Sequence, residues 1–344
     1  MKATIKMIAE RAGVHPSTVD KVLHNRVGVS DEVRQKIQGI IRELDYRPNP
    51  AGRILQRQGA KYRIGTVLVR VDALPYLNEG IRSGIARQTG LDIELLEHVA
   101  PFQDADGQAD ILNRLTDERV DAIIVSPITS AKVMRAIGRA QSLGIPVVTT
   151  NSDLPESGRL CYVGQDGYHA SQVAGRIMGL MLGGKGKIAV VSSAIDDENN
   201  SYYVTIREKG FRDFISRVYP NIRIIETVES FESAEITYRE TLQVLKAHPD
   251  LKGIYVTCGG AAQVSRAVLE NGRASDIRVL TYEDYPEILE LLRQDVIDVT
   301  ISGELKRQGE LPVQVIMDCL VLGKRPECEQ MFTDIRVLFK ESLS

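Results

Sequence analysis

Polar side chains gather at the start of a short amphipathic stretch near the N-terminus. Residues 16–23 begin with a proline and carry apolar residues at Val19, Val22 and Leu23, the spacing of one helix face. The other face carries hydroxyl, carboxylate, imidazole and ammonium groups, which can bind base edges and phosphates. The candidate residues are His15, Pro16, Ser17, Thr18, Asp20 and Lys21.

Two further helical stretches are placed to hold this face in position. Residues 5–12 are apolar at helical spacing after an N-cap residue, Thr4, and Gly13 then suits a tight turn. A third helix follows Ser30 and buries a stripe of Val33, Ile37, Ile40, Ile41 and Leu44. The order predicts a helix-turn-helix, and a three-helix bundle without a nucleic-acid role is the alternative.

Charge is distributed unevenly along the 344 residues. Residues 1–61 hold 12 Lys/Arg against 6 Asp/Glu, whereas the whole chain has a net charge of −3. A basic head on an acidic body favours a nucleic-acid-binding module joined to a second binding unit. No apolar run approaches the length of a membrane helix, and no secretory signal is present, so we expect a cytoplasmic protein.

Short motifs follow one another through the head: Thr4-Ile5, Ala9-x-x-Ala12-Gly13-Val14, Ser17-Thr18-Val19, Val22-Leu23-x-Asn25, Val29-Ser30 and Tyr46-Arg47-Pro48-Asn49-Pro50. Their order and spacing resemble the DNA-binding domain of the lactose-repressor (LacI/GalR) family of bacterial regulators. The resemblance implies that residues 1–46 form a DNA-binding domain whose second helix enters the major groove. It adds His24 and Asn25 as phosphate contacts. Lys21 stands where the family has Arg, and Asp20 replaces a Ser, so we expect an unusual operator preference.

Residues 47–61 resemble the hinge segment of the same family, which becomes helical on the operator. The resemblance implies that Leu55 enters the minor groove as an apolar wedge, and Arg53 joins the expected DNA contacts. Gly52 costs a helix about 1 kcal/mol relative to Ala, so this hinge should fold only on DNA. A plain tether is the alternative.

From residue 62 the chain alternates apolar strands with amphipathic helices, the pattern of parallel sheets covered by helices on both faces. The expected strands are 64–71, 92–99, 120–126, 145–150, 187–192, 222–228, 253–257, 277–282, 298–302 and 333–339. The expected helices are 77–89, 105–117, 131–143, 167–183, 203–217, 233–247, 260–272, 284–294 and 304–322. Their number suggests two similar α/β lobes.

The body carries Gly144-Ile145-Pro146-Val147-Val148, Asn151-Ser152-Asp153, Tyr162-Val163-Gly164, Arg207-x-x-Gly210-Phe211 and His248-Pro249-Asp250. These motifs resemble the periplasmic-binding-protein-like, sugar-binding body of the same family. The resemblance implies a ligand-binding domain over 62–344, with one lobe of 62–164 and 304–329 and another of 165–303 and 330–344. The ligand would lie between them, at the carboxyl ends of the strands.

The same resemblance implies which residues bind the ligand: Asn151, Asp153, Asp166, Arg207, Cys258, Tyr282 and Glu283. Carboxylates and amides bind sugar hydroxyls, and an Arg fork donates to them. An exposed helix position is the alternative for Arg207. Cys258-Gly259 stands where the family has Asn-Asp, and Gly303 where it has Gln, so a standard hexose is in question. Without Trp, aromatic stacking would come from Tyr76, Tyr202 or Tyr203.

Motifs for catalysis, metals and cofactors are missing from the sequence. Residues 183–187 lack the spacing of a phosphate-binding loop, and the histidines and four cysteines are scattered. We therefore expect neither an enzyme nor a cofactor or metal site. An α/β enzyme and a free solute-binding protein are remote alternatives.

The sequence thus predicts a DNA-binding transcriptional regulator, most simply a repressor, that responds to a small molecule in the cleft. Its partners would be double-stranded operator DNA of near-palindromic sequence and a sugar-like effector, with a sugar acid or phosphorylated metabolite as the alternative. Tetramers of the family carry an extra C-terminal helix, and the sequence ends soon after the last expected strand, so we expect a homodimer.

Overall fold

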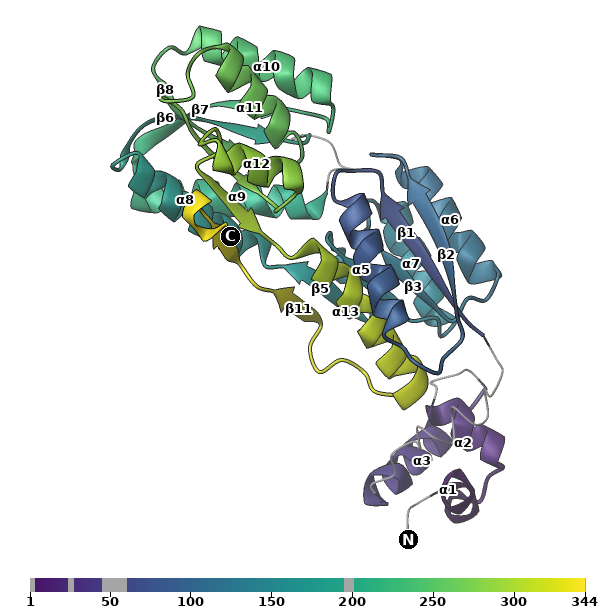
Figure 1. Cartoon of the computed structure of the whole chain (residues 1–344). Helices are drawn as coiled ribbons and strands as arrows, with labels where there is room; N and C mark the ends of the chain where they lie inside the picture. Colours follow the sequence, from purple (N-terminus) through teal and green to yellow (C-terminus); the bar gives the residue numbers. More distant parts are fainter. Residues whose placement is uncertain (1–3, 24–27, 45–60, 195–200, 344) are drawn as a thin grey trace.

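The computed structural model describes residues 4–23, 28–44, 61–194 and 201–343. Its N-terminal part consists of three helices, α1 (Ile5–Ala12), α2 (Pro16–Leu23) and α3 (Asp31–Glu43), seen at the purple end of the chain in Figure 1. The Thr4 hydroxyl accepts from the backbone N–H of Met7, and Gly13 ends α1 with φ of 71°. Glycine adopts this left-handed conformation without strain. The turn between α1 and α2 is therefore set by local chemistry.

One small core holds the three head helices together. Ile8, Val19 and Ile37 are fully buried there, one from each helix. The expected inward positions of α2 are confirmed, because Val19 and Val22 are buried and Leu23 is half-buried against the same core, while Pro16 and Ser17 are exposed.

The first lobe is a parallel sheet of six strands in the order β11-β5-β4-β3-β1-β2. Its central strands are buried on both faces and therefore read as continuous apolar runs, such as Ala122–Val125 in β3. The strands are β1 (Tyr62–Val69), β2 (Ile93–Ala100), β3 (Ala122–Val125), β4 (Val147–Thr150), β5 (Cys161–Gln165) and β11 (Gln330–Thr333). The helices around it are α5 (Leu74–Ala86), α6 (Ala105–Asp117), α7 (Ala131–Ser142) and α13 (Leu305–Met317). Separate apolar clusters line its two faces.

The second lobe repeats this architecture, with six strands in the order β12-β10-β9-β8-β6-β7. Neighbouring strands of this sheet are parallel, except that the edge strand β12 pairs antiparallel with β10. The strands are β6 (Lys185–Ser192), β7 (Asn221–Glu229), β8 (Leu251–Val256), β9 (Arg278–Tyr282), β10 (Val299–Ser302) and β12 (Arg336–Leu338). The helices are α8 (Gly167–Met181), α9 (Tyr202–Val218), α10 (Ala234–Ala247), α11 (Ala261–Glu270) and α12 (Pro286–Arg293). Figure 1 shows the two lobes as neighbouring bodies.

The C-terminal part of the chain corrects the expected lobe boundary. We expected the second lobe to resume at residue 330, with one strand over 333–339. Instead β11 pairs with β5 in the first sheet, and only β12 joins the second sheet. The strand β5, which the sequence analysis missed, supplies the edge on which β11 pairs. The chain therefore crosses between lobes at 334–335.

Close backbone packing fixes α13 against α5 in the first lobe. A Cβ at Gly80 would lie 2.0 Å from the carbonyl oxygen of Lys306, and one at Gly309 would lie 2.3 Å from that of Leu77. Only glycine permits this approach, which places the start of α13 beside the cleft.

Candidate DNA-binding face and ligand cleft

The first turn of α2 presents a polar surface. His15, Pro16, Ser17 and Lys21 are exposed, whereas Thr18 and Asp20 are half-buried. The His15 ring nitrogen Nδ1 accepts from the backbone N–H of Ser17 and lies 2.8 Å from its hydroxyl. His15 thus acts as a cap of α2 in the free protein, a role that the sequence analysis did not anticipate.

The remaining expected DNA contacts cannot be placed in the structure. His24, Asn25, Arg53 and Leu55 lie outside the described residues, as does most of the expected hinge.

A cavity of about 620 Å³ lies between the two lobes. It is lined by the loops that follow the carboxyl ends of strands in both sheets, where ligands bind in open α/β sheets. Five of the seven expected ligand residues line it: Asn151, Arg207, Cys258, Tyr282 and Glu283. Its volume falls in the range of small-molecule sites.

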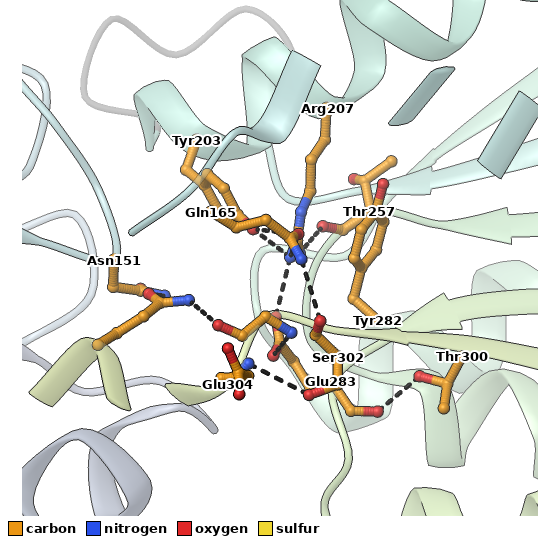
Figure 2. A network of polar contacts seen from close by, with 12 residues as sticks. Asn151, Gln165, Tyr203, Arg207, Thr257, Tyr282, Glu283, Thr300, Ser302 and Glu304 are labelled. Carbon is orange, nitrogen blue, oxygen red and sulfur yellow. Dashed lines mark hydrogen bonds and ion pairs between the residues drawn. The ribbon is translucent and has the colours of Figure 1, made fainter. Parts of the chain in front are cut away.

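Arg207 on α9 is the centre of a polar network at this cavity (Figure 2). Only 3% of its surface is exposed, so the alternative of an exposed helix position is wrong. Its Nη2 donates to Glu283 Oε1 at 2.9 Å and to the Tyr203 hydroxyl, and its Nη1 donates to the Thr257 carbonyl at 3.0 Å. The guanidinium also lies 3.4 Å from the ring centroid of Tyr282. This network fixes the guanidinium before any ligand arrives.

Burial shapes the titration of the carboxylate that pairs with Arg207. It raises the pKa of Glu283, and the charge of Arg207 offsets only part of that effect. A buried ion pair of this kind holds its geometry because either partner alone would be costly.

The network continues from Arg207 into the segments that join the lobes. The Tyr203 hydroxyl donates a hydrogen bond to Gln165 Oε1 at 2.9 Å, and Gln165 Nε2 donates one to the Ser302 carbonyl at 3.1 Å. Gln165 ends β5 and Ser302 ends β10, where the chain crosses between sheets. The Gly303 carbonyl beside them accepts from Thr333 at the end of β11. Hydrogen bonds therefore connect residues that line the cavity to the chain at each of the three places where it crosses between the lobes.

Two expected ligand residues lie elsewhere, which corrects the sequence analysis. Asp153 is 1% exposed and forms a two-point ion pair with Arg159, at 2.5 and 2.6 Å, inside the first lobe. Asp166 caps α8 through the His169 N–H and pairs with the His169 ring. Neither lines the cavity. Each carboxylate is bound by a residue nearby in the sequence. A residue's position in a family motif does not reveal such a local partner.

The cavity also contains residues that the sequence analysis missed, chiefly the carboxylates Asp72 and Glu232 and the side chains Phe102, Gln103, Gln263 and Tyr285. Four lining residues other than glycine have positive φ: Gln103 (61°), Asn151 (63°), Glu232 (52°) and Glu283 (74°). Such backbone strain clusters at functional sites, where it aims side chains. All four follow strand ends, which is the signal that could have identified Gln103 and Glu232 as well.

Aromatic and hydroxyl contacts join the two lobes around the cavity. Tyr76 on α5 stacks on Tyr285 before α12, with centroids 4.5 Å apart and planes at 16°. The Ser201 hydroxyl lies 3.2 Å from that of Ser152 across the cleft. Of the tyrosines proposed for stacking, Tyr76 and Tyr203 line the cavity, whereas Tyr202 does not. The lobes are therefore in contact at two places beside the cavity.

The part of the chain that the structure describes contains no group of three or more metal-ligating side chains. None of its helices has the length and apolar character needed to cross a membrane.

Comparison with known proteins identifies both parts of the chain. Residues 4–49 match the lacI family of bacterial regulatory proteins, and residues 85–325 match the periplasmic binding protein domain. The chain is a lacI-family DNA-binding domain on a body of the periplasmic binding protein family. These lacI-type regulators and binding proteins are not enzymes.

Individual relatives of this lacI-type chain come from both groups. The transcriptional regulator GntR of Pseudomonas aeruginosa is 25% identical over 83% of this chain and 80% of its own length. The D-apiose import binding protein of Paraburkholderia graminis is 25% identical over 63% of this chain and 67% of its own. The structure of GanP, a glucose-galactose binding protein from Geobacillus stearothermophilus, superimposes with a TM-score of 0.73 at 26% identity, covering 82% of this chain and 99% of GanP.

Proposed function

We propose that this chain is a cytoplasmic repressor that binds a near-palindromic operator as a homodimer and responds to a sugar in its cleft. The first turn of α2 would read base edges, with Lys21 donating to guanine, and Leu55 would wedge open the minor groove. Two-fold symmetry of the dimer would match two operator half-sites.

The observation that carries this proposal is the bonding of the cavity to the crossings between the lobes. A ligand that contacts Arg207 acts on a guanidinium joined through Tyr203 and Gln165 to Ser302. A change there alters the relative position of the lobes and hence of the two heads in a dimer. This is linkage between two sites through a hinged body.

The sugar is supported by the relatives and by the cavity. GanP is a glucose-galactose binding protein and the Paraburkholderia relative is a D-apiose import binding protein, and both are similar to the body of this chain. The cavity offers an amide at Asn151, carboxylates and aromatic rings, the groups that bind hydroxyls and sugar faces.

Selection of DNA by the full-length chain tests the DNA-binding part of the proposal. Random duplexes bound by the protein should converge on a two-fold symmetric sequence, and the complex should have the mass of two chains on one duplex. Recovery of unrelated sequences, or of one chain per duplex, would contradict it. Lys21→Ala should relax the preference at one position in each half-site, by about 1–3 kcal/mol.

A further inference from the structure

The cavity between the lobes carries more negative than positive charge. Its charged lining residues are the carboxylates Asp72, Glu232, Glu283 and Glu287 and a single guanidinium, Arg207, among the residues that the structure describes. Arg207 is already engaged by Glu283 at 2.9 Å and by two oxygen acceptors. It therefore balances Glu283 and leaves the other carboxylates uncompensated.

Asp72 and Glu232 approach each other from opposite lobes. Asp72 follows β1 of the first lobe, and Glu232 follows β7 of the second. Both point to the place that a side chain at Gly259 would fill: a Cβ there would lie 2.4 Å from Glu232 Oε2 and 3.0 Å from Asp72 Oδ2. The lack of a side chain at Gly259 thus lets carboxylate oxygens of both lobes approach the same place in the cavity wall.

Like charges facing each other in this way favour a cation between them. Among the described residues, no Lys, Arg or His forms an ion pair with Asp72 or Glu232. Burial, with the charge of Asp72 as a further cause, raises the pKa of Glu232 to about 7. The Ser193 hydroxyl, the backbone amide of Gly259 and the charge of Arg207 offset only part of this effect. An ammonium group has three donors and could bind both carboxylates at once.

A separate observation at the same cavity points to a ligand with acceptor groups. The Nε of Arg207 is buried and has no hydrogen-bond partner within the described residues. Buried donors are nearly always paired, but this atom has almost no accessible surface, so a ligand oxygen reaches it only if the side chains around it move. A sugar hydroxyl supplies such an oxygen without adding a charge.

We propose that the cleft selects an amine-bearing polyol, such as an amino sugar, with its ammonium group between Asp72 and Glu232 and its hydroxyls at the Arg207 end. This inference rests on the proposed function, in which the cleft is the effector site. It disfavours sugar acids and phosphorylated metabolites, because their negative charge would face the same carboxylates. Because Asp72 and Glu232 belong to different lobes, an ammonium bound to both would also hold the two lobes together around the ligand.

Calorimetric titration of the full-length protein with matched ligands tests this inference. The probes are glucosamine, glucose and gluconate, and galactosamine, galactose and galactonate, at pH 7 and low salt. In at least one series the amine should bind about tenfold or more tightly than the neutral sugar, and the acid should bind most weakly. Tighter binding of the acid than of its neutral parent, or no amine preference in either series, overturns the inference.

Two variants locate the selectivity. Asp72→Asn and Glu232→Gln should each weaken binding of the amine more than binding of the neutral sugar, and so remove most of the amine preference. Glu79→Gln, which removes an exposed carboxylate of α5 paired with Lys306, is the matched control and should retain the preference. If the protein with both substitutions, Asp72→Asn and Glu232→Gln, still prefers the amine, other groups cause the preference and the inference is overturned.

A stability measurement on the ligand-free protein gives a second readout. Asp72→Asn should raise the melting temperature, since it removes one of two facing charges, whereas Glu79→Gln should not. A lower melting temperature for Asp72→Asn would contradict the claim that Asp72 and Glu232 face each other without a compensating charge. If no sugar of any charge binds the wild-type protein, the proposed function of the cleft fails as well; if neutral sugars bind without an amine preference, only this inference fails.

Discussion

At the scale of single residues, Arg207 is the side chain on which the cleft depends. Its guanidinium satisfies Glu283, the Tyr203 hydroxyl and the Thr257 carbonyl, and it lies over the Tyr282 ring. Lys cannot reproduce this planar set of donors. The residue is buried, so its replacement affects stability as well as binding, unlike the loss of an Arg at the exposed helix position that was the alternative.

Arg207→Lys should therefore weaken sugar binding by ~10-fold or more and lower the free energy of unfolding by about 1–3 kcal/mol, because buried acceptors lose their donor. Calorimetry and thermal unfolding measure the two effects. Arg82→Lys, at an exposed ion pair with Glu97, is the matched control and should change neither. Unchanged sugar affinity in Arg207→Lys would refute the role given to this residue.

Glu232 should make stability depend on pH in an unusual direction. Its pKa is about 7 in the folded protein against an ordinary value of 4.5, so the folded state binds its proton more readily. Its contribution to the free energy of unfolding therefore rises as pH falls from about 8 to about 5. Since one pKa unit corresponds to about 1.4 kcal/mol, the effect is a few kcal/mol at most.

The measurement is the difference in unfolding free energy between the wild type and Glu232→Gln across this pH range. Subtraction removes the contribution of carboxylates with lowered pKa values, such as Asp213 and Asp250, which act in the opposite direction. Parallel profiles for the two proteins would show that Glu232 has an ordinary pKa.

The sequence predicts some of the cleft residues well and others poorly, for a physical reason. Arg207 lies in a family-like motif and Glu283 directly follows β9, so the fold sets their surroundings and brings them together. Asp153 lies in such a motif too, but Arg159 six residues later binds it. Asp72 and Glu232 are recognisable only as residues after strands, because their meeting depends on how two lobes close on each other.

At the scale of elements, the packing of α13 on α5 holds the first lobe together beside the cleft. A Cβ at Gly309 would lie 2.3 Å from the Leu77 carbonyl oxygen and 2.8 Å from the Ile81 nitrogen, both backbone atoms. Gly309→Ala should therefore lower the free energy of unfolding by about 1–3 kcal/mol through overpacking.

Gly138→Ala is the matched control, since this helical glycine of α7 would place its Cβ 3.6 Å from the Ser157 carbonyl oxygen, an ordinary contact. That change should raise stability by about 0.5–1 kcal/mol through helix propensity. Chemical denaturation of both variants gives the comparison. A Gly309→Ala protein as stable as the wild type would show that the helices separate easily.

Most elements of the body follow from apolar periodicity, but the C-terminal strands do not. β11 and β12 contain four and three residues and are separated by Asp334 and Ile335. Such short segments read as one strand in sequence. Their assignment to different sheets depends on the available edges of β5 and β10, which are set by tertiary structure.

At the scale of the whole molecule, the account joins a DNA-binding head to a two-lobed body through contacts that converge on the lobe crossings. Gln165, Ser302 and Thr333 each end a strand at a different crossing, and hydrogen bonds connect the first two to the cavity network. Tyr76 and Tyr285 also stack between the lobes. Ligand binding and lobe arrangement are therefore expected to be one equilibrium.

The most direct test of this account is operator affinity measured with and without a cleft ligand. The full-length protein is titrated onto an operator obtained by selection, at fixed salt, with and without a saturating sugar that calorimetry shows to bind. We expect the sugar to change the operator dissociation constant by ~5-fold or more, and Arg207→Lys to lose this response while retaining operator binding. A bound sugar that leaves the operator dissociation constant of the wild-type protein unchanged would contradict the coupling between cleft and head.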